Sequence, residues 1–137
     1  MFKVLALLAC VSLTGCTTLT CTEIGCQSGA EIQLSPPLQP GSYEIEVSAG
    51  TGSAFCAVTI GDLDTVDCTG TLTDVRIEAG MIFVGGTPPT VAIQITTESG
   101  TIADEAIDLE YESQQPNGSG CPPICSVAEA ELAVSTD

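Results

Sequence analysis

The sequence predicts an all-β protein, an immunoglobulin-like antiparallel β-sandwich of about seven or eight short strands held together by disulfides. Three observations support this fold class. Apolar and polar residues alternate along successive short segments, Gly- and Pro-containing turns separate those segments, and the 137 residues include eight cysteines. No convincing helical period occurs between residue 20 and the last dozen or so residues. One domain over residues 21–137 is expected, because no repeat or low-complexity linker divides the chain.

Five segments alternate clearly between apolar and polar residues, as strands with one buried face do. Their apolar members are Tyr43, Ile45 and Val47; Val75, Ile77 and Ala79; Val91, Ile93 and Ile95; Ile107, Leu109 and Tyr111; and Ala130, Leu132 and Val134. Further strands are expected over residues 31–34, 54–60 and 81–84. The last alternating segment is rich in alanine and glutamate, so a short helix over residues 127–133 is the alternative there.

Composition excludes several classes of function. The chain carries 2 Lys and Arg residues against 18 Asp and Glu residues, with no histidine and no tryptophan, for a formal net charge of -16. Phosphate backbones repel such a surface, so nucleic-acid binding is not expected. Without histidine the commonest general base and metal ligand is missing, and no nucleophile–base pair can be assembled. We therefore expect a protein that is not an enzyme.

The N-terminal segment has the features of an export signal. Lys3 precedes an apolar run over residues 4–13 that is too short to span a bilayer. The run ends in Leu13-Thr14-Gly15-Cys16, which resembles the lipobox of bacterial lipoproteins, a leucine and two small residues before a cysteine. The resemblance implies that residues 1–15 are removed and that the Cys16 sulfur carries a diacylglyceryl group. The alternative is an ordinary cleaved signal peptide with a coincidental cysteine.

The same resemblance implies where the protein is held. Two or three acyl chains on Cys16 anchor a protein firmly, whereas one chain holds only marginally. Thr17, rather than an aspartate, follows Cys16. In the enterobacterial sorting rule this favours the outer over the inner membrane. Residues 16–20 would then form the lipidated cysteine and a short tether.

The number of cysteines agrees with lipidation. Cys10 would leave with the signal peptide and Cys16 would carry the lipid, so six cysteines remain. An even number suits three disulfides in an oxidising compartment. Cys56 and Cys68 lie symmetrically about the tip of an expected hairpin over residues 54–73. We expect them to pair across its two strands.

The other four cysteines lie near the two ends of the domain. Cys21 and Cys26 are expected to pair with Cys121 and Cys125, which would tie the ends together. Two local bridges, one within each pair, are the alternative, because six cysteines allow about fifteen pairings. Zinc thiolate ligation is a further alternative, which export and the lack of histidine disfavour.

Asp62, Asp64 and Asp67 form the densest group of carboxylates in the sequence. Calcium binds several hard oxygen ligands at close quarters, and this Gly-led loop supplies three. The spacing is not that of an EF-hand. The simpler interpretation is a solvated hairpin turn built from good turn-forming residues.

Paired carboxylates can catalyse glycoside hydrolysis, and the candidate pairs are Glu44 with Glu46 and Glu110 with Glu112. Each pair is expected on the outward face of one strand, in contact with water. No tryptophan is present to stack a sugar. Solubility and protection against edge pairing are the favoured roles.

Two further residues carry specific expectations. Arg76 could hold the carboxylate of a ligand, but cross-strand pairing with nearby acidic residues is favoured. Asn117, in the tripeptide Asn117-Gly118-Ser119, matches the N-glycosylation acceptor pattern. Next to a bacterial lipobox, it is better interpreted as part of a turn.

These features predict a lipid-anchored protein of the bacterial cell envelope, whose acidic β-sandwich is a non-enzymatic interaction or structural module. The membrane, through the N-terminal lipid, and an envelope protein are the expected partners. The alternative hypothesis is a small binding module for calcium or a cationic ligand, through the loop from Asp62 to Asp67. No cofactor is expected beyond that calcium ion. The sequence leaves the partner, the disulfide pairing and the oligomeric state open.

Overall fold

Ten strands form two five-stranded sheets in residues 21–136, the part of the chain that the computed structural model describes. Sheet A contains β1 (Gly29–Ser35), β5 (Val75–Glu78), β6 (Met81–Gly85), β9 (Glu112–Gln114) and β10 (Cys125–Ala133). Sheet B contains β2 (Gly41–Ala49), β3 (Gly52–Ile60), β4 (Thr65–Gly70), β7 (Thr90–Thr97) and β8 (Gly100–Asp108). The strand orders are β5-β6-β1-β10-β9 and β4-β3-β2-β7-β8.

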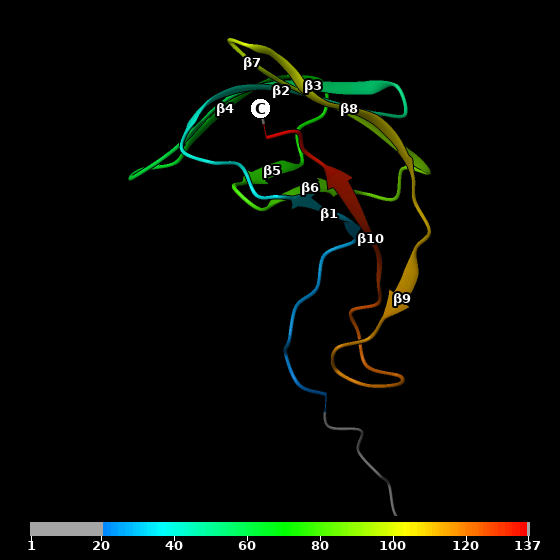
Figure 1. Ribbon diagram of the computed structural model, residues 1–137. Helices are drawn as coiled ribbons and strands as arrows, with labels where there is room; N and C mark the ends of the chain where they lie inside the picture. The colour runs from blue at the N-terminus through cyan, green and yellow to red at the C-terminus, as the bar shows by residue number, and fades with distance from the viewer. Residues whose placement is uncertain (1–20, 137) are drawn as a thin grey trace, which may run out of the picture.

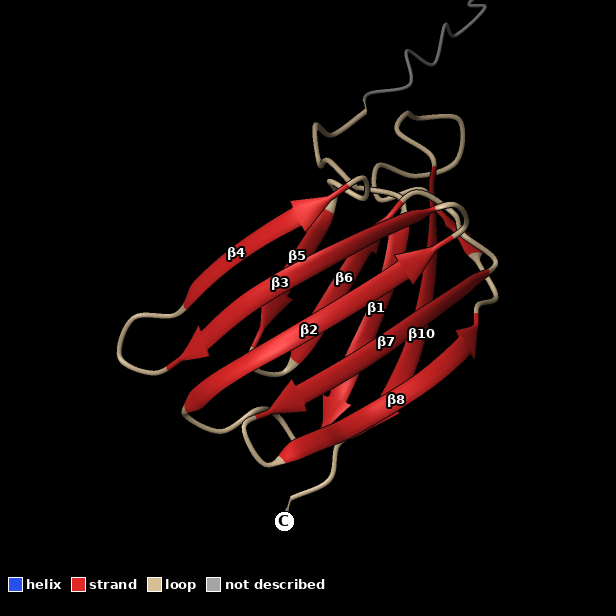
Figure 2. Ribbon diagram, turned by 90° about the horizontal axis from the view of Figure 1, so that it is seen from above, coloured by secondary structure: helices blue, strands red, loops and turns tan. Residues whose placement is uncertain are grey.

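The two sheets lie face to face, with sheet B arching over sheet A (Figure 1). Seen from above, the five strands of sheet B cross in front of β5, β6, β1 and β10 (Figure 2). The expected all-β sandwich is therefore confirmed. The count of ten strands in the described residues exceeds the expected seven or eight.

The core between the sheets is aliphatic. Alternation places Ile45 and Val47 of β2 and Ile93 and Ile95 of β7 inward, as the sequence predicts, and all four are buried. The largest fully buried side chains are Ile32, Ile45, Ile82, Ile93, Ile95, Leu132, Val47, Val58, Val84 and Val91. No polar or charged side chain is buried in residues 21–136. Neither of the phenylalanines in this part of the chain belongs to the core cluster.

The first and last strands of the domain pair in the middle of sheet A. β1 and β10 run parallel, from Gly29 opposite Val127 to Ser35 opposite Ala133. The C-terminal segment is thus a strand and not the alternative helix, with Ala128 buried in the core. The other strand pairs of residues 21–136 are antiparallel, as expected, so this parallel pair is the exception within the sandwich.

The expected strand over residues 107–111 is also wrong. β8 ends at Asp108, because the chain there leaves sheet B and crosses to β9 in sheet A. Leu109 remains buried and its N–H donates to the Pro89 carbonyl at 2.8 Å, outside either sheet. Apolar and polar residues do alternate over residues 107–111, but residues 109–111 lie in the segment that connects sheet B to sheet A.

Between residues 21 and 136 no helix is long and apolar enough to cross a membrane. The expected signal peptide, Cys16 and the tether lie outside the described residues.

Candidate functional site

The β3–β4 hairpin carries the disulfide that the sequence predicts. Cys56 lies directly opposite Cys68 in the strand register, and the two are joined with their Cα atoms 4.0 Å apart. β4 is an edge strand whose residues are all exposed, so core packing holds it weakly. The disulfide therefore ties this edge to sheet B and fixes its register.

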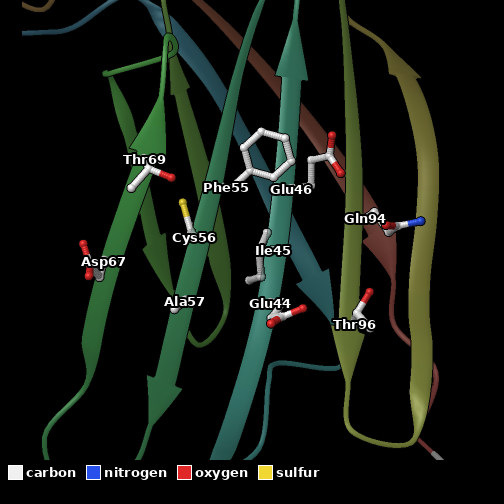
Figure 3. Close-up of a pocket in the computed structure, with 10 residues that line it drawn as sticks. All are labelled: Glu44, Ile45, Glu46, Phe55, Cys56, Ala57, Asp67, Thr69, Gln94 and Thr96. Carbon is white, nitrogen blue, oxygen red and sulfur yellow. The ribbon is translucent and has the colours of Figure 1, made fainter.

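The outer face of sheet B carries the candidate site. We call it the acidic face and define it by Glu44, Glu46, Phe55, Ala57, Asp67, Thr69, Gln94 and Thr96, which line a shallow depression of about 410 Å³. These side chains come from four neighbouring strands, β4, β3, β2 and β7, and point to the same side of the sheet (Figure 3). Alternation that buries the other residues of β2, β3 and β7 turns their members outward, and strand pairing places those of β4 beside them.

The depression has an alanine at its centre. Ala57 lies between Glu44 on β2 and Asp67 on β4, each directly opposite it in register. Because the Ala57 side chain is a single methyl group, the two carboxylates border an open hollow. With neighbouring strands about 4.8 Å apart, the Cα atoms of the two acids lie about 10 Å from each other.

Phe55 forms one wall of the hollow. It lies on β3 two residues before Ala57, with Glu46 opposite it on β2 and Thr69 opposite it on β4. The ring stands beside the Glu46 carboxylate in Figure 3. Its side chain is 52% exposed, which is unusual for a phenylalanine in a β-sheet. An exposed aromatic ring thus lies among carboxylates.

The position of Glu44 and Glu46 changes one interpretation of the sequence. Protection against edge pairing was a favoured role for these residues, but β2 is the central strand of sheet B and has neighbours on both sides. That role is therefore wrong for Glu44 and Glu46. It suits Glu112, since β9 is an edge strand of sheet A.

The structure separates the three aspartates that were considered as calcium ligands. Asp64 accepts a hydrogen bond from the Gly61 N–H at 2.9 Å, which closes the turn between β3 and β4. Asp67 instead lines the depression of the acidic face, and Asp62 does not. Within residues 21–136 no group of three or more His, Cys, Asp or Glu side chains is placed to hold a metal ion. The loop is a hairpin turn that the Asp64 side chain closes.

Arg76 makes contacts that the sequence did not predict. Its guanidinium lies over the Phe83 ring, 4.2 Å from the ring centroid, and donates from Nη2 to Gln27 Oε1 at 3.1 Å. Gln27 Nε2 in turn donates to Asp74 Oδ2 at 2.8 Å. The expected direct pairing with a neighbouring acid is replaced by contact through a glutamine.

Phe83 lies on the outer face of sheet A. It is 4% exposed, yet it lies outside the core cluster, which contains its chain neighbours Ile82 and Val84. The ring crosses Gly29 of β1 so closely that a Cβ there would overlap Phe83 Cζ. Glycine at position 29 therefore allows the ring to lie against the sheet, where Arg76 covers it. Sequence patterning could not reveal this arrangement, because Gly29 and Phe83 meet through strand pairing.

The remaining disulfides join two segments that extend from one end of the sandwich. Cys21 is bonded to Cys121 and Cys26 to Cys125, the long-range pairing expected from the sequence, so the local bridges and the zinc thiolate site are not formed. We call residues 21–28 and 115–124 the extension. The blue and orange segments run together there in Figure 1.

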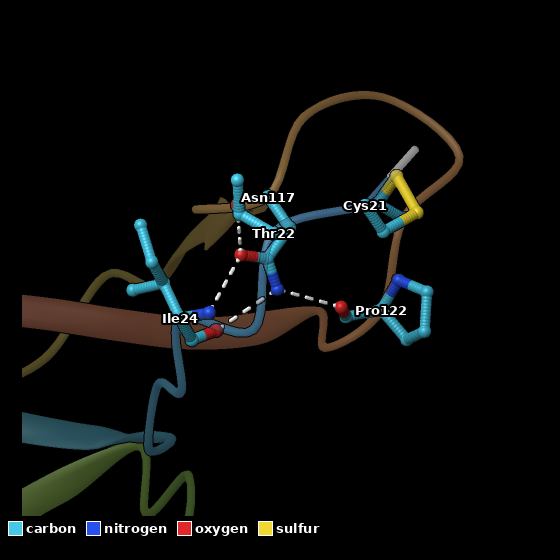
Figure 4. The surroundings of a disulfide bond; sticks show 6 residues. Cys21, Thr22, Ile24, Asn117 and Pro122 are labelled. Carbon is cyan, nitrogen blue, oxygen red and sulfur yellow. Dashed lines mark hydrogen bonds between the residues drawn. A yellow bond between two sulfur atoms is a disulfide. The ribbon is translucent and has the colours of Figure 1, made fainter. Parts of the chain in front are cut away.

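Asn117 fixes the extension next to the Cys21–Cys121 disulfide (Figure 4). Its Oδ1 accepts from Thr22 Oγ1 at 2.7 Å and from the Ile24 N–H at 2.9 Å. Its Nδ2 donates to the carbonyls of Ile24 at 2.9 Å and Pro122 at 2.8 Å. Asn117 lies in a turn, as expected, but its side chain also connects the two ends of the domain.

Comparison with protein-family models, with curated proteins and with solved structures finds no match for this chain. What the protein does must therefore be inferred from the acidic face, the extension and the N-terminal sequence.

Proposed function

We propose that this protein is a lipid-anchored component of the bacterial cell envelope, at the outer rather than the inner membrane, and acts there as a non-enzymatic interaction module. The acidic face is the surface that meets the partner. One observation carries the proposal: sheet B holds carboxylates and an exposed phenylalanine around an open hollow, on β2, β3 and the edge strand β4. Exposed apolar side chains framed by polar ones are typical of interaction surfaces.

The lipobox-like sequence Leu13-Thr14-Gly15-Cys16 supports the anchor. Three disulfides support a location outside the cytoplasm, where such bonds persist. Cys21 follows Cys16 by five residues, which span about 18 Å when fully extended. The extension would therefore hold the sandwich close to the lipid surface.

Charge indicates the chemistry of the partner. After signal cleavage, Arg76 would be the one basic side chain against 18 acidic residues. Such a field attracts a basic protein surface over long distances and repels acidic ones. Of the carboxylates of the acidic face, Glu44 and Asp67 are exposed and Glu46 is half-buried. They are therefore suited to attracting a cationic group.

The anchor is tested by the intact mass of the mature protein purified from its native membrane, with and without reductant. A chain starting at Cys16 with added acyl mass is expected, gaining two hydrogens for each of the three disulfides on reduction. Cys16→Ser is the control and is expected to lose the acyl mass. An unlipidated wild-type mass would contradict the anchor.

The interaction face is tested by photo-cross-linking in intact cells. A photoreactive amino acid replaces Ala57 on the acidic face or, as a matched control, Gln33 on the exposed side of β1 in sheet A. Discrete cross-linked species are expected from position 57 and not from position 33. They should disappear when Glu44→Lys and Glu46→Lys are introduced together. Equal cross-linking from both positions would contradict the proposal.

A further inference from the structure

The chain contains two phenylalanines on the outer faces of its two sheets, in opposite states. Phe83 on sheet A is covered by Arg76, whereas Phe55 on sheet B is open to solvent. Arg76 is the single basic side chain of residues 21–136 and lies on the other sheet, so no cation of this part of the chain covers Phe55. The open ring is therefore available to a cation from another molecule.

The Phe83 site shows how this protein covers an outward aromatic ring. Arg76 lies directly opposite Phe83 in the β5–β6 register, and its guanidinium sits 4.2 Å from the ring centroid. A hydrogen bond to Gln27 holds the guanidinium there. The face of an aromatic ring carries partial negative charge, so it attracts such a cation.

Phe55 has the complementary surroundings. Glu46 lies directly opposite its ring on β2, as Glu31 lies opposite Phe83, but its neighbour on the edge strand is Thr69 where Phe83 has Arg76. Gln94 of β7 lies opposite Glu46 on the side away from Phe55. Its Nε2 donates to Asp104 Oδ2 at 3.4 Å and not to the Glu46 carboxylate. A guanidinium stacked on Phe55 can donate two parallel hydrogen bonds to a carboxylate at this position.

We propose, resting on the proposed function, that the partner inserts an arginine side chain onto the acidic face. Its guanidinium stacks on Phe55 and pairs with Glu46, while a second basic group of the same segment lies in the hollow between Glu44 and Asp67. Charge complementarity favours a basic segment. The exposed ring favours arginine over lysine, because a planar guanidinium can stack and pair with a carboxylate at once.

The test uses the mature lipidated protein in lipid nanodiscs and three synthetic probe peptides, acetyl-Gly-Arg-Gly-Arg-Gly-amide and its lysine and citrulline counterparts. Nuclear magnetic resonance follows the ring protons of Phe55 and Phe83. We expect the arginine peptide to shift the Phe55 signals, with an affinity about threefold to tenfold above that of the lysine peptide. Citrulline, which keeps the shape but not the charge, should not bind. The covered Phe83 ring should not respond.

Two variants separate stacking from charge. Phe55→Leu should reduce the affinity for the arginine peptide to that for the lysine peptide, and Phe55→Tyr should retain the preference. Both substitutions are at an exposed position, and an unchanged circular dichroism spectrum would confirm that the sheet persists. Equal binding of arginine and lysine peptides, or no effect of Phe55→Leu, would overturn the arginine inference alone. Absence of cross-links from position 57 would instead overturn the proposed function.

Discussion

On the outer face of sheet A, Phe83 lies opposite Arg76 of the edge strand β5, whereas on the outer face of sheet B, Phe55 lies opposite Thr69 of the edge strand β4. The two rings otherwise occupy equivalent positions, because each also faces a glutamate on the central strand of its sheet, Glu31 for Phe83 and Glu46 for Phe55. The first ring is 4% exposed and the second 52%. The Phe83 ring is thus covered by a cation of the same chain, whereas the Phe55 ring is not.

This difference in exposure separates a side chain that stabilises the fold, Phe83, from one that is free to bind a partner, Phe55. A ring that is covered by its own arginine contributes to the stability of the fold. A ring that remains half-exposed among carboxylates contributes little burial, and the neighbouring acids repel one another. The two faces should therefore respond differently to the same substitutions.

The largest difference is expected when each ring is removed. Phe83→Ala should lower the free energy of unfolding by about 3 to 4 kcal/mol, because it deletes a buried aromatic side chain and uncovers the sheet beneath. Phe55→Ala should lower it by less than about 1 kcal/mol, as is usual for an exposed site. Urea unfolding of both variants under non-reducing conditions measures the two values. Equal losses would show that the two faces do not differ in this way.

A second substitution displaces the covered Phe83 ring without changing Phe83 itself. Gly29→Ala places a Cβ that overlaps the Phe83 ring and lies 2.7 Å from the Val84 carbonyl oxygen. We expect a loss of about 2 kcal/mol from this overpacking. Gly25→Ala is the matched control, because nothing lies within 4 Å of a Cβ at that position. If the two alanines cost the same, the contact between Gly29 and the ring is not important for stability.

The core of both faces was predictable from the sequence, because strand alternation is a local property. Ile45 and Val47 are buried as expected, and Cys56 pairs with Cys68 because a hairpin brings its two strands together along the chain. The parallel pairing of β1 with β10 was not predictable, since more than ninety residues separate their partners. The same limit applies to Asn117, whose partner Ile24 lies 93 residues away.

The candidate site was predictable in its residues but not in its arrangement. Glu44 and Glu46 were singled out from the sequence as one acid pair, and Asp67 separately as a calcium ligand. Their assembly depends on the strand order β4-β3-β2, which alternation does not determine. Phe55 was missed because an outward position in a strand gives no sign of what lies opposite it.

A third prediction concerns the segment that links the two sheets. Tyr111 lies where the chain crosses from sheet B to sheet A, and its hydroxyl donates to the Pro88 carbonyl at 2.7 Å. Tyr111→Phe should cost about 1 kcal/mol at neutral pH through loss of this hydrogen bond. The effect concerns neither outer face, so it should leave binding of the arginine peptide unchanged.

The pH dependence of this variant has a defined sign. Burial raises the pKa of Tyr111 above its ordinary value of 10.0, so the folded protein keeps a proton that the unfolded chain releases. The stabilising contribution of Tyr111 is therefore complete below pH 10 and declines as the pH rises through that value. Urea unfolding between pH 8 and pH 11 should show the wild-type advantage over Tyr111→Phe shrinking. A constant advantage across this range would contradict the burial effect.

The smallest change in stability is expected from a substitution that gives Phe55 a cation of the chain's own. Glu46→Arg places a guanidinium opposite Phe55 on the central strand β2, whereas Arg76 covers Phe83 from the edge strand β5, and it removes one carboxylate from the acidic face. Cation–π contact and reduced repulsion should raise the free energy of unfolding by about 0.5 kcal/mol. The arginine peptide should then no longer bind, because the protein's own arginine occupies the ring. Glu46→Gln, which removes the charge without covering the ring, should weaken binding but retain the preference for arginine over lysine. If Glu46→Arg still bound the arginine peptide selectively, the open state of Phe55 could not be the cause of that selectivity.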